Sequence, residues 1–220
     1  MPSLTLVIGN KTYSSWSLRP WFLLKHLGLA FEEIVIPLYE GGTPDAIRRY
    51  SAAGKVPVLI DGSTTVWESL AICEYLAERR PDAWPRDAHA RAIARSVASE
   101  MHAGFASLRA ELPMNVRERR SGVEPSSAAR ADIARVIEIW GTCRQAASGS
   151  GPWLFGDFSV ADAMYAPVAT RFHTYGVALP EHAARYVTTV LTDPAMEEWV
   201  AAARKESQRI PGAERGEPVS

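Results

Sequence analysis

Cysteine is scarce in this chain of 220 residues, which has only Cys73 and Cys143 and no CxxC or His/Cys cluster around them. Two cysteines are too few for a disulfide framework, and without clustered ligands they do not indicate a zinc site. We therefore expect two buried thiols in a reducing compartment, and no bound metal.

The chain also lacks an excess of charge of either sign, since its formal net charge is -1 and acidic and basic residues are mixed along it. That balance offers no positive surface to nucleic acid or to an anionic membrane. No run of about 18 apolar residues occurs, and the N-terminus has no basic stretch followed by an apolar core. We expect a cytoplasmic protein that binds a small molecule or another protein, with no nucleic acid and no membrane.

The pattern of the first 80 residues alternates between two periods. Short apolar or β-branched runs predict strands at residues 4–8, 32–37, 58–60 and 65–67. Helical spacing predicts helices at residues 18–27, 44–50 and 69–79, the first of them closed by Gly28, which suits a left-handed cap. The expected unit is an α/β domain over residues 1–80 with the order βαβαββα.

Beyond residue 85 the chain is rich in alanine and arginine and has helical periodicity only. One apolar face predicts a long helix through Val97, Met101, Phe105, Leu108 and Leu112. Further helices are expected at residues 126–147, 159–171, 183–191 and 193–203. We therefore expect an all-helical domain over residues 86–210 and a loose polar tail over residues 211–220.

Residues 13–20 (YSSWSLRP) place Ser14, Ser15, Trp16 and Ser17 at a predicted strand-to-helix turn. A helix N-terminus favours an anion such as a thiolate. Lowering a thiol pKa by two units from about 8.5 takes about 2.7 kcal/mol, and a hydrogen bond to a charged acceptor supplies about 1.5 to 3 kcal/mol. One serine and the helix dipole would therefore suffice. Alternatively, Ser17 only caps the helix, and Ser14 and Ser15 are loop residues.

A proline interrupts the strand-like run GKVPVL at Pro57. A cis Val56–Pro57 bond would turn the Val56 amide and carbonyl outward, where an extended peptide can pair with them. Because only about 5 to 6% of such bonds are cis, the residues alone favour a trans proline that opens a strand.

Glu68 and Ser69 lie where a predicted strand meets a predicted helix. Ser69 is suited to be the N-cap, with amides behind it that can hold a carboxylate, and Glu68 can accept from an ammonium group. The simpler alternative is a capped helix beside a solvated glutamate.

These three segments, in this order, resemble the thioredoxin-like N-terminal domain of the cytosolic glutathione transferases. The resemblance covers essentially the whole chain, because Ser159 and Asp162 in FGDFSVAD have the spacing of a capping box and are similar to the buried N-cap of that family. We interpret Asp162 as structural. The resemblance implies glutathione as cosubstrate, a small electrophilic second substrate and a homodimer.

Within that family the chain is similar to the serine-using theta and zeta members, which carry SSCS where this chain reads SSWS. Ser14 matches the position of the activating serine, with Ser15 and Ser17 as alternatives. Trp16 replaces the cysteine. This difference weakens the inference of maleylacetoacetate isomerase activity from the resemblance, and it disfavours thiol exchange by the chain itself.

The resemblance also implies roles around the predicted cosubstrate. The backbone of Val56, beside Pro57, would pair with the cysteinyl part. Glu68 and Ser69 would hold the γ-glutamyl ammonium and carboxylate, and Lys55 would reach the glycyl carboxylate.

The second substrate is expected between the domains, where candidate contacts are Trp16, Met101, His102, Phe105 and Arg109. For Met101 and Phe105 an ordinary core position is the simpler alternative, whereas His102 and Arg109 share one face of the predicted helix. Arg171 and His173 are further candidates. Lys11 and Arg19 are expected to be solvated charges.

The leading hypothesis is a glutathione transferase in which Ser14 stabilises the glutathione thiolate for attack on an electrophilic carbon. One alternative is a glutathione-dependent isomerase that acts on an unsaturated diacid. Another is a binding or interaction module that keeps the fold and catalyses nothing.

Overall fold

The computed structural model describes residues 4–147 and 151–219. Its N-terminal part is built on a four-stranded sheet with the order β2-β1-β3-β4. The strands are β1 (Leu4–Ile8), β2 (Phe31–Val35), β3 (Val58–Asp61) and β4 (Thr64–Trp67). β1 runs parallel to β2 and antiparallel to β3, and β3 is antiparallel to β4.

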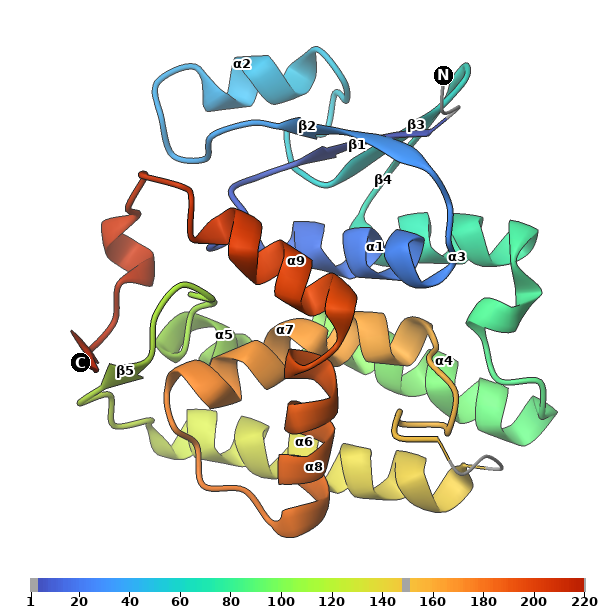
Figure 1. Cartoon of the computed structure of the whole chain (residues 1–220), viewed down its shortest axis with the longest axis vertical. Helices are drawn as coiled ribbons and strands as arrows, with labels where there is room; N and C mark the ends of the chain where they lie inside the picture. Colours follow the sequence, from blue (N-terminus) through green and yellow to red (C-terminus); the bar gives the residue numbers. More distant parts are fainter. Residues whose placement is uncertain (1–3, 148–150, 220) are drawn as a thin grey trace.

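Helices α1 (Ser15–His26) and α3 (Ser69–Arg79) cover one face of this sheet, and α2 (Thr43–Arg48) covers the other (Figure 1). Strands and helices follow one another in the predicted βαβαββα order. Gly28 follows α1 with φ +63°, as the predicted left-handed cap requires.

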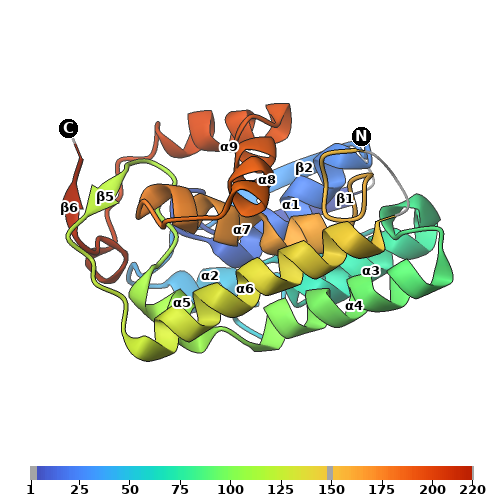
Figure 2. The same cartoon turned by 90° about the horizontal axis from the view of Figure 1, so that it is seen from below.

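The C-terminal part is helical and packs against α1 (Figures 1 and 2). After a 3₁₀ turn, η1 (Pro81–Ala83), the helices are α4 (Ala88–Ala103), α5 (Ala106–Glu111), α6 (Ser127–Ala146), α7 (Val160–Thr174), α8 (Glu181–Leu191) and α9 (Pro194–Ala203). α1 therefore lies between the sheet on one side and α7 and α9 on the other. None of the helices in the described part of the chain combines the length and apolar character that a membrane crossing needs.

The prediction of one continuous helix through residues 97–112 is wrong. α4 ends at Ala103, and Phe105 adopts φ +63° before α5 begins. The break depends on Gly104, where a Cβ would lie only 2.8 Å from the carbonyl oxygen of Glu100. The apolar spacing continues from α4 into α5, so the sequence pattern does not indicate the break between the two helices.

The capping box at the start of α7 is present, as predicted. The fully buried Asp162 carboxylate accepts from the Ser159 amide at 2.8 Å, the Ser159 hydroxyl at 3.0 Å and the Leu154 amide at 2.9 Å. Burial raises the pKa of Asp162 to about 6. These contacts support a structural role for Asp162.

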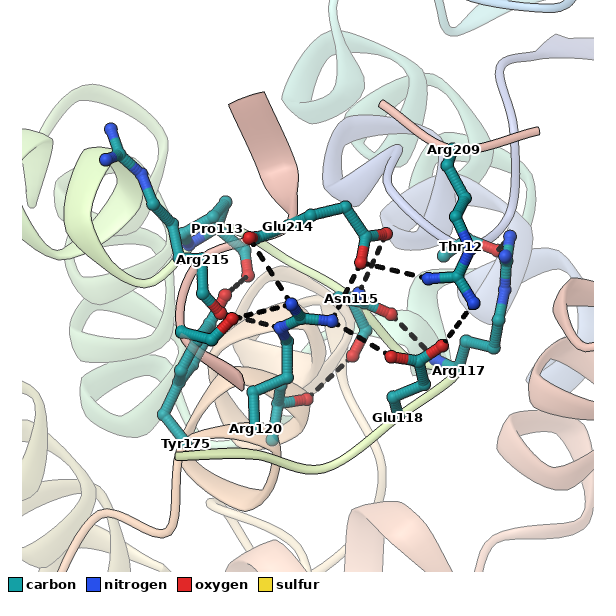
Figure 3. Close-up of polar contacts among 12 residues, drawn as sticks. Thr12, Pro113, Asn115, Arg117, Glu118, Arg120, Tyr175, Arg209, Glu214 and Arg215 are labelled. Carbon is teal, nitrogen blue, oxygen red and sulfur yellow. Dashed lines mark hydrogen bonds and ion pairs between the residues drawn. The ribbon is translucent and has the colours of Figure 1, made fainter. Parts of the chain in front are cut away.

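The expectation of a loose tail is wrong for residues 211–219. This segment forms η2 (Pro211–Ala213) and β6 (Glu217–Pro218), which pairs with β5 (Arg120–Ser121). The buried Arg120 guanidinium donates to the Glu214 carboxylate at 2.7 Å and to the carbonyls of Arg215 and Gly216 (Figure 3). These partners are distant in sequence, so no local pattern announces them.

Candidate active site

A hollow of about 250 Å³ lies where three loops of the α/β part meet. It is lined by the first turn of α1, the loop before β3 and the β4–α3 junction, through Trp16, Ala53, Lys55, Val56, Pro57, Trp67, Glu68 and Ser69. The structure therefore brings together the residues that the resemblance assigns to glutathione, with Trp16 beside them. Two larger hollows lie on the helical part. The residues that line them in the described part of the chain do not combine a helix N-terminus with an unpaired strand edge, as those of the first hollow do.

The loop before β3 presents free backbone groups to this hollow. The Val56–Pro57 bond is cis, whereas the residues alone favoured trans. β3 begins only at Val58, and within residues 4–147 and 151–219 the Val56 amide and carbonyl make no backbone hydrogen bond. An extended peptide can therefore pair with Val56 as an added strand.

The β4–α3 junction contributes an acidic side chain and a helix N-terminus. Glu68 is exposed and adopts φ +70°, an uncommon conformation of the kind found at ligand sites. Ser69 is the first residue of α3 and Glu68 holds the N-cap position, so the prediction of Ser69 as the N-cap is wrong. The free amides of this first turn suit a carboxylate, and Glu68 suits an ammonium group.

The serines lie behind Trp16 in the first turn of α1. The predicted helix start at residue 18, with Ser17 as cap, is wrong, because α1 begins at Ser15 and Ser14 holds the N-cap position. Ser17 Oγ accepts from the Gly9 amide at 3.1 Å and lies 2.7 Å from Ser14 Oγ, which donates to it. All three serines are buried, and of residues 14–17 only Trp16 lines the hollow.

Trp16 contacts charged side chains from both parts of the fold. Its ring centroid lies 4.3 Å from Arg19 Cζ, 4.6 Å from Arg109 Cζ and 5.4 Å from the His102 ring centroid. Arg109 reaches back across the α4–α5 break and donates to the carbonyl of Gly104 at 2.9 Å and to that of His102 at 3.3 Å. Arg109 therefore lies near His102 because its side chain folds back onto the C-terminal end of α4. The prediction that the two residues share one face of a single helix is wrong, because His102 lies in α4 and Arg109 in α5.

His102 also faces Glu68, with 3.7 Å between its Nε2 and the carboxylate. Burial lowers the pKa of His102, and the nearby Arg19 and Arg109 lower it further, against the opposing effect of Glu68. The surroundings of His102 therefore favour its neutral imidazole.

Other predicted side chains lie elsewhere. Met101 and Phe105 belong to the apolar core, with 0% and 7% exposure, so they do not reach the hollow and the alternative of ordinary core is correct. His173 is exposed and lines a different hollow on the helical part.

The expectation that Lys11 and Arg19 are solvated is wrong. Lys11 is 8% exposed and pairs with Glu33 at 2.8 Å, and Arg19 has no exposed surface. Arg171, also buried, donates from Nη2 to Ser15 Oγ at 3.2 Å. α1 has no solvent face for Arg19, because the sheet and the helical part enclose it.

The turn before the serines is held by the C-terminal segment. The Glu206 carboxylate accepts from the Lys11 amide at 2.6 Å, the Thr12 amide at 2.9 Å and the Thr12 hydroxyl at 2.7 Å. The Tyr13 hydroxyl donates to Glu214, and burial together with this bond raises the pKa of Tyr13 to about 12. Tyr13 is therefore directed to the tail and away from the hollow.

The chain offers no thiolate of its own from its two cysteines. Cys73 and Cys143 are both free and buried, as predicted. Burial raises the pKa of each thiol to about 12. A reactive sulfur at this site must come from a ligand.

An α/β part with a four-stranded mixed sheet followed by a helical part defines the class of protein, and the comparisons identify it. The family model for the glutathione S-transferase N-terminal domain matches residues 13–79, and that for the C-terminal domain matches residues 89–202. The chain belongs to the glutathione S-transferase family.

Its curated relatives are similar over part of their length only. Glutathione S-transferase Z1 of Arabidopsis thaliana is 36% identical over 90 residues, which cover 38% of this chain and 41% of that protein. A probable maleylacetoacetate isomerase of Caenorhabditis elegans is 36% identical over 91 residues, which cover 39% of this chain and 42% of that protein. The chain thus spans about two fifths of the length of these relatives.

Solved structures match over nearly the whole fold. A glutathione transferase homolog from Burkholderia with bound glutathione has a TM-score of 0.69 at 24% identity and covers 92% of this chain and 99% of that one. The theta class enzyme of Xanthomonas axonopodis pv. citri with glutathione bound has a TM-score of 0.65 at 22% identity and covers 91% and 98%. These similarities establish the fold.

Proposed function

We propose that this protein is a glutathione transferase that binds glutathione in the 250 Å³ hollow and transfers its sulfur to a small electrophile. The observation that carries the proposal is the convergence of three segments distant in sequence on that hollow. Two of the segments offer groups that the tripeptide needs, at Lys55 and Val56 and at Glu68 and Ser69, and the third places Trp16 beside them. Similar folds in the Burkholderia and Xanthomonas proteins, whose structures contain glutathione, support it.

The hollow supplies a partner for each end of the tripeptide. The unpaired Val56 backbone receives the cysteinyl part as a short strand. The first turn of α3 at Ser69 holds the γ-glutamyl carboxylate, and Glu68 holds the ammonium group. Lys55, exposed at the rim, pairs with the glycyl carboxylate.

We assign stabilisation of the thiolate to Ser14. A hydroxyl can rotate, so Ser17 can donate to Ser14 while it keeps the bond from Gly9, which frees the Ser14 proton for the thiolate. The N-terminus of α1 adds the positive end of its dipole. Ser15 is the alternative, because its hydroxyl receives a bond from Arg171 and retains its own proton.

The chain's part in the reaction is positioning and pKa tuning. With the thiol ionised at neutral pH, its sulfur forms a bond to the electrophilic carbon as the leaving group departs with its electron pair. An isomerase would use the same thiolate to form a transient adduct with an unsaturated diacid. Isomerisation returns glutathione unchanged, whereas conjugation consumes it.

Retention on immobilised glutathione, followed by turnover of a panel of electrophiles, tests this proposal. We expect specific elution by free glutathione, and thiol consumption with at least one electrophile. Retention without turnover would favour the non-catalytic binding module, and turnover of an unsaturated diacid without thiol consumption would favour the isomerase. No retention would exclude every glutathione-dependent function.

A further inference from the structure

One C-terminal segment, residues 206–214, binds all four residues that precede Ser14, and we call this segment the strap. Each of the four donates a hydrogen bond to a side chain of the strap. The pairs are Asn10 with Gln208, Lys11 and Thr12 with Glu206, and Tyr13 with Glu214. Two of the three acceptor side chains are carboxylates, which form stronger hydrogen bonds than neutral acceptors do. The strap therefore holds the whole turn before Ser14.

This turn sets the place of Ser14. The Ser14 amide donates to the Asn10 carbonyl at 2.9 Å, and the Tyr13 amide donates to the same oxygen at 3.2 Å. The side-chain oxygen of Asn10 accepts from the Leu38 amide at 2.7 Å, and Gln208 donates to the Leu38 carbonyl at 2.7 Å. A shift of the turn would therefore carry Ser14 with it.

The strap is itself anchored to the helical part of the chain. The buried Arg120 guanidinium donates to the Glu214 carboxylate at 2.7 Å (Figure 3). Arg117 Nη2 donates to the Gln208 carbonyl at 2.9 Å and to the Thr12 hydroxyl at 3.2 Å, so it joins the strap to the turn. The position of Ser14 thus depends on contacts with the helical part.

The strap stays apart from the two segments that we propose to hold glutathione. In the described ranges, no hydrogen bond or ion pair joins residues 206–214 to residues 53–57 or 67–69, and no strap residue lines the hollow. Loss of a strap contact should therefore affect Ser14 and leave the groups at Val56, Glu68 and Ser69 in place.

We propose that the strap positions the Ser14 hydroxyl for the glutathione thiolate, with Glu206 as its principal positioning residue. This inference rests on the proposed function, in which Ser14 donates to that thiolate. Placement matters because a hydrogen bond weakens steeply when its geometry departs from the ideal, and a misplacement of about 1 Å can cost about 100-fold in rate. The helical part thereby supports thiolate stabilisation, whereas the α/β part holds the tripeptide.

Glu206→Ala tests this role through the pKa of the bound glutathione thiol, measured from the ultraviolet absorbance of the thiolate. The variant removes the acceptor of three hydrogen bonds from the turn. We expect the thiol pKa to rise by about one unit, which is part of the shift that a hydrogen bond to a charged acceptor supplies. The dissociation constant of glutathione at about pH 5, where the thiol is protonated both free and bound, should not change. Glu206→Gln keeps an acceptor oxygen and should raise the thiol pKa less.

A double variant shows whether Glu206 acts through Ser14. In a Ser14→Ala protein, the further change Glu206→Ala should leave the thiol pKa where Ser14→Ala alone puts it, because effects that pass through one group do not add. A second, additional rise would mean that Glu206 acts on the thiolate by another route, and it would overturn the positioning role.

Two control variants separate positioning from stability. Glu217→Gln removes an exposed charge in β6, just beyond the strap, and should leave the thiol pKa unchanged. Ser126→Ala removes the side chain that accepts from the Ala129 amide at the start of α6. It should lower the unfolding free energy by about 1 kcal/mol, with no change in the thiol pKa.

The outcomes separate this inference from the proposed function. An unchanged thiol pKa in folded Glu206→Ala overturns the inference, as does an equal rise in Ser126→Ala. Weaker glutathione binding at about pH 5 with an unchanged thiol pKa also overturns it, because the strap would then act on tripeptide binding. Should Glu206→Ala not fold, Glu206→Gln decides by the same comparison. If the thiol titrates like free glutathione in the unmodified complex, the proposed function itself fails, and the inference fails with it.

Discussion

Replacing the serines of the first turn of α1 one at a time separates thiolate stabilisation from support of the fold. If Ser14 donates to the thiolate, Ser14→Ala removes a hydrogen bond to a charged acceptor, worth about 1.5 to 3 kcal/mol. That energy corresponds to about one to two pKa units. The pH profile of kcat/KM for the electrophile, at saturating glutathione, should therefore move to higher pH by that amount. The KM for glutathione should change little.

Ser17→Ala is the matched control for this experiment. Ser17 Oγ accepts from the buried Gly9 amide at 3.1 Å, so its loss leaves a buried donor without a partner. Such a loss costs about 1 to 3 kcal/mol of unfolding free energy. We expect a lower urea midpoint for Ser17→Ala, with a pH profile that moves less than that of Ser14→Ala.

Two results would refute the reasoning about Ser14. An unchanged profile in Ser14→Ala with an alkaline shift in Ser15→Ala would transfer the role to Ser15, whose hydroxyl Arg171 contacts at 3.2 Å. Unchanged profiles in all three variants would mean that no serine of this turn stabilises the thiolate.

Further predictions concern the tail, the ammonium site and the α7 cap. Glu206→Gln weakens the acceptor of the Lys11 and Thr12 amides, so kcat and the urea midpoint should both fall. If both stay unchanged, Glu206 does not position the turn before the serines. Glu68→Gln should raise the KM for glutathione about tenfold or more by removing the partner of the ammonium group, and an unchanged KM would remove Glu68 from the site. Because burial raises the pKa of Asp162 from 3.8 to about 6, its protonation favours the folded state. Protonation of Asp162 contributes roughly 3 kcal/mol to the unfolding free energy. The contribution is complete below pH 3.8 and is lost as the pH rises through about 6. The unfolding free energy of the unmodified protein relative to Asp162→Asn should therefore rise on acidification, and a pH-independent difference would contradict the burial argument.

Features set by local chemistry were predictable from the sequence. The strands of the α/β part follow from short apolar runs, Gly28 from its place after a helical pattern, and the Ser159–Asp162 capping box from its spacing. The five residues that we expected around glutathione line one hollow: Lys55, Val56, Pro57, Glu68 and Ser69. Trp16, which we expected at the second substrate, lines the same hollow. Their order resembles a known family, and that resemblance supplied what the separate motifs did not.

Features set by distant packing were not predictable. A helical pattern assigns Arg19 to solvent, but α7 and α9 cover the side of α1 that the sheet leaves open. Glu206 and Thr12 are 194 residues apart, so their contact has no local signature. The contact of Arg171 with Ser15 is of the same kind, because it joins residues that are 156 positions apart.

The titration of bound glutathione tests the central claim most directly. Thiolate absorbs in the ultraviolet, so the absorbance of the protein–glutathione complex, corrected for the protein alone, gives the pKa of the bound thiol. The account predicts saturable binding and a thiol pKa about two units below that of free glutathione in the same buffer. A bound thiol with the same pKa as free glutathione, or the absence of saturable binding, would contradict it.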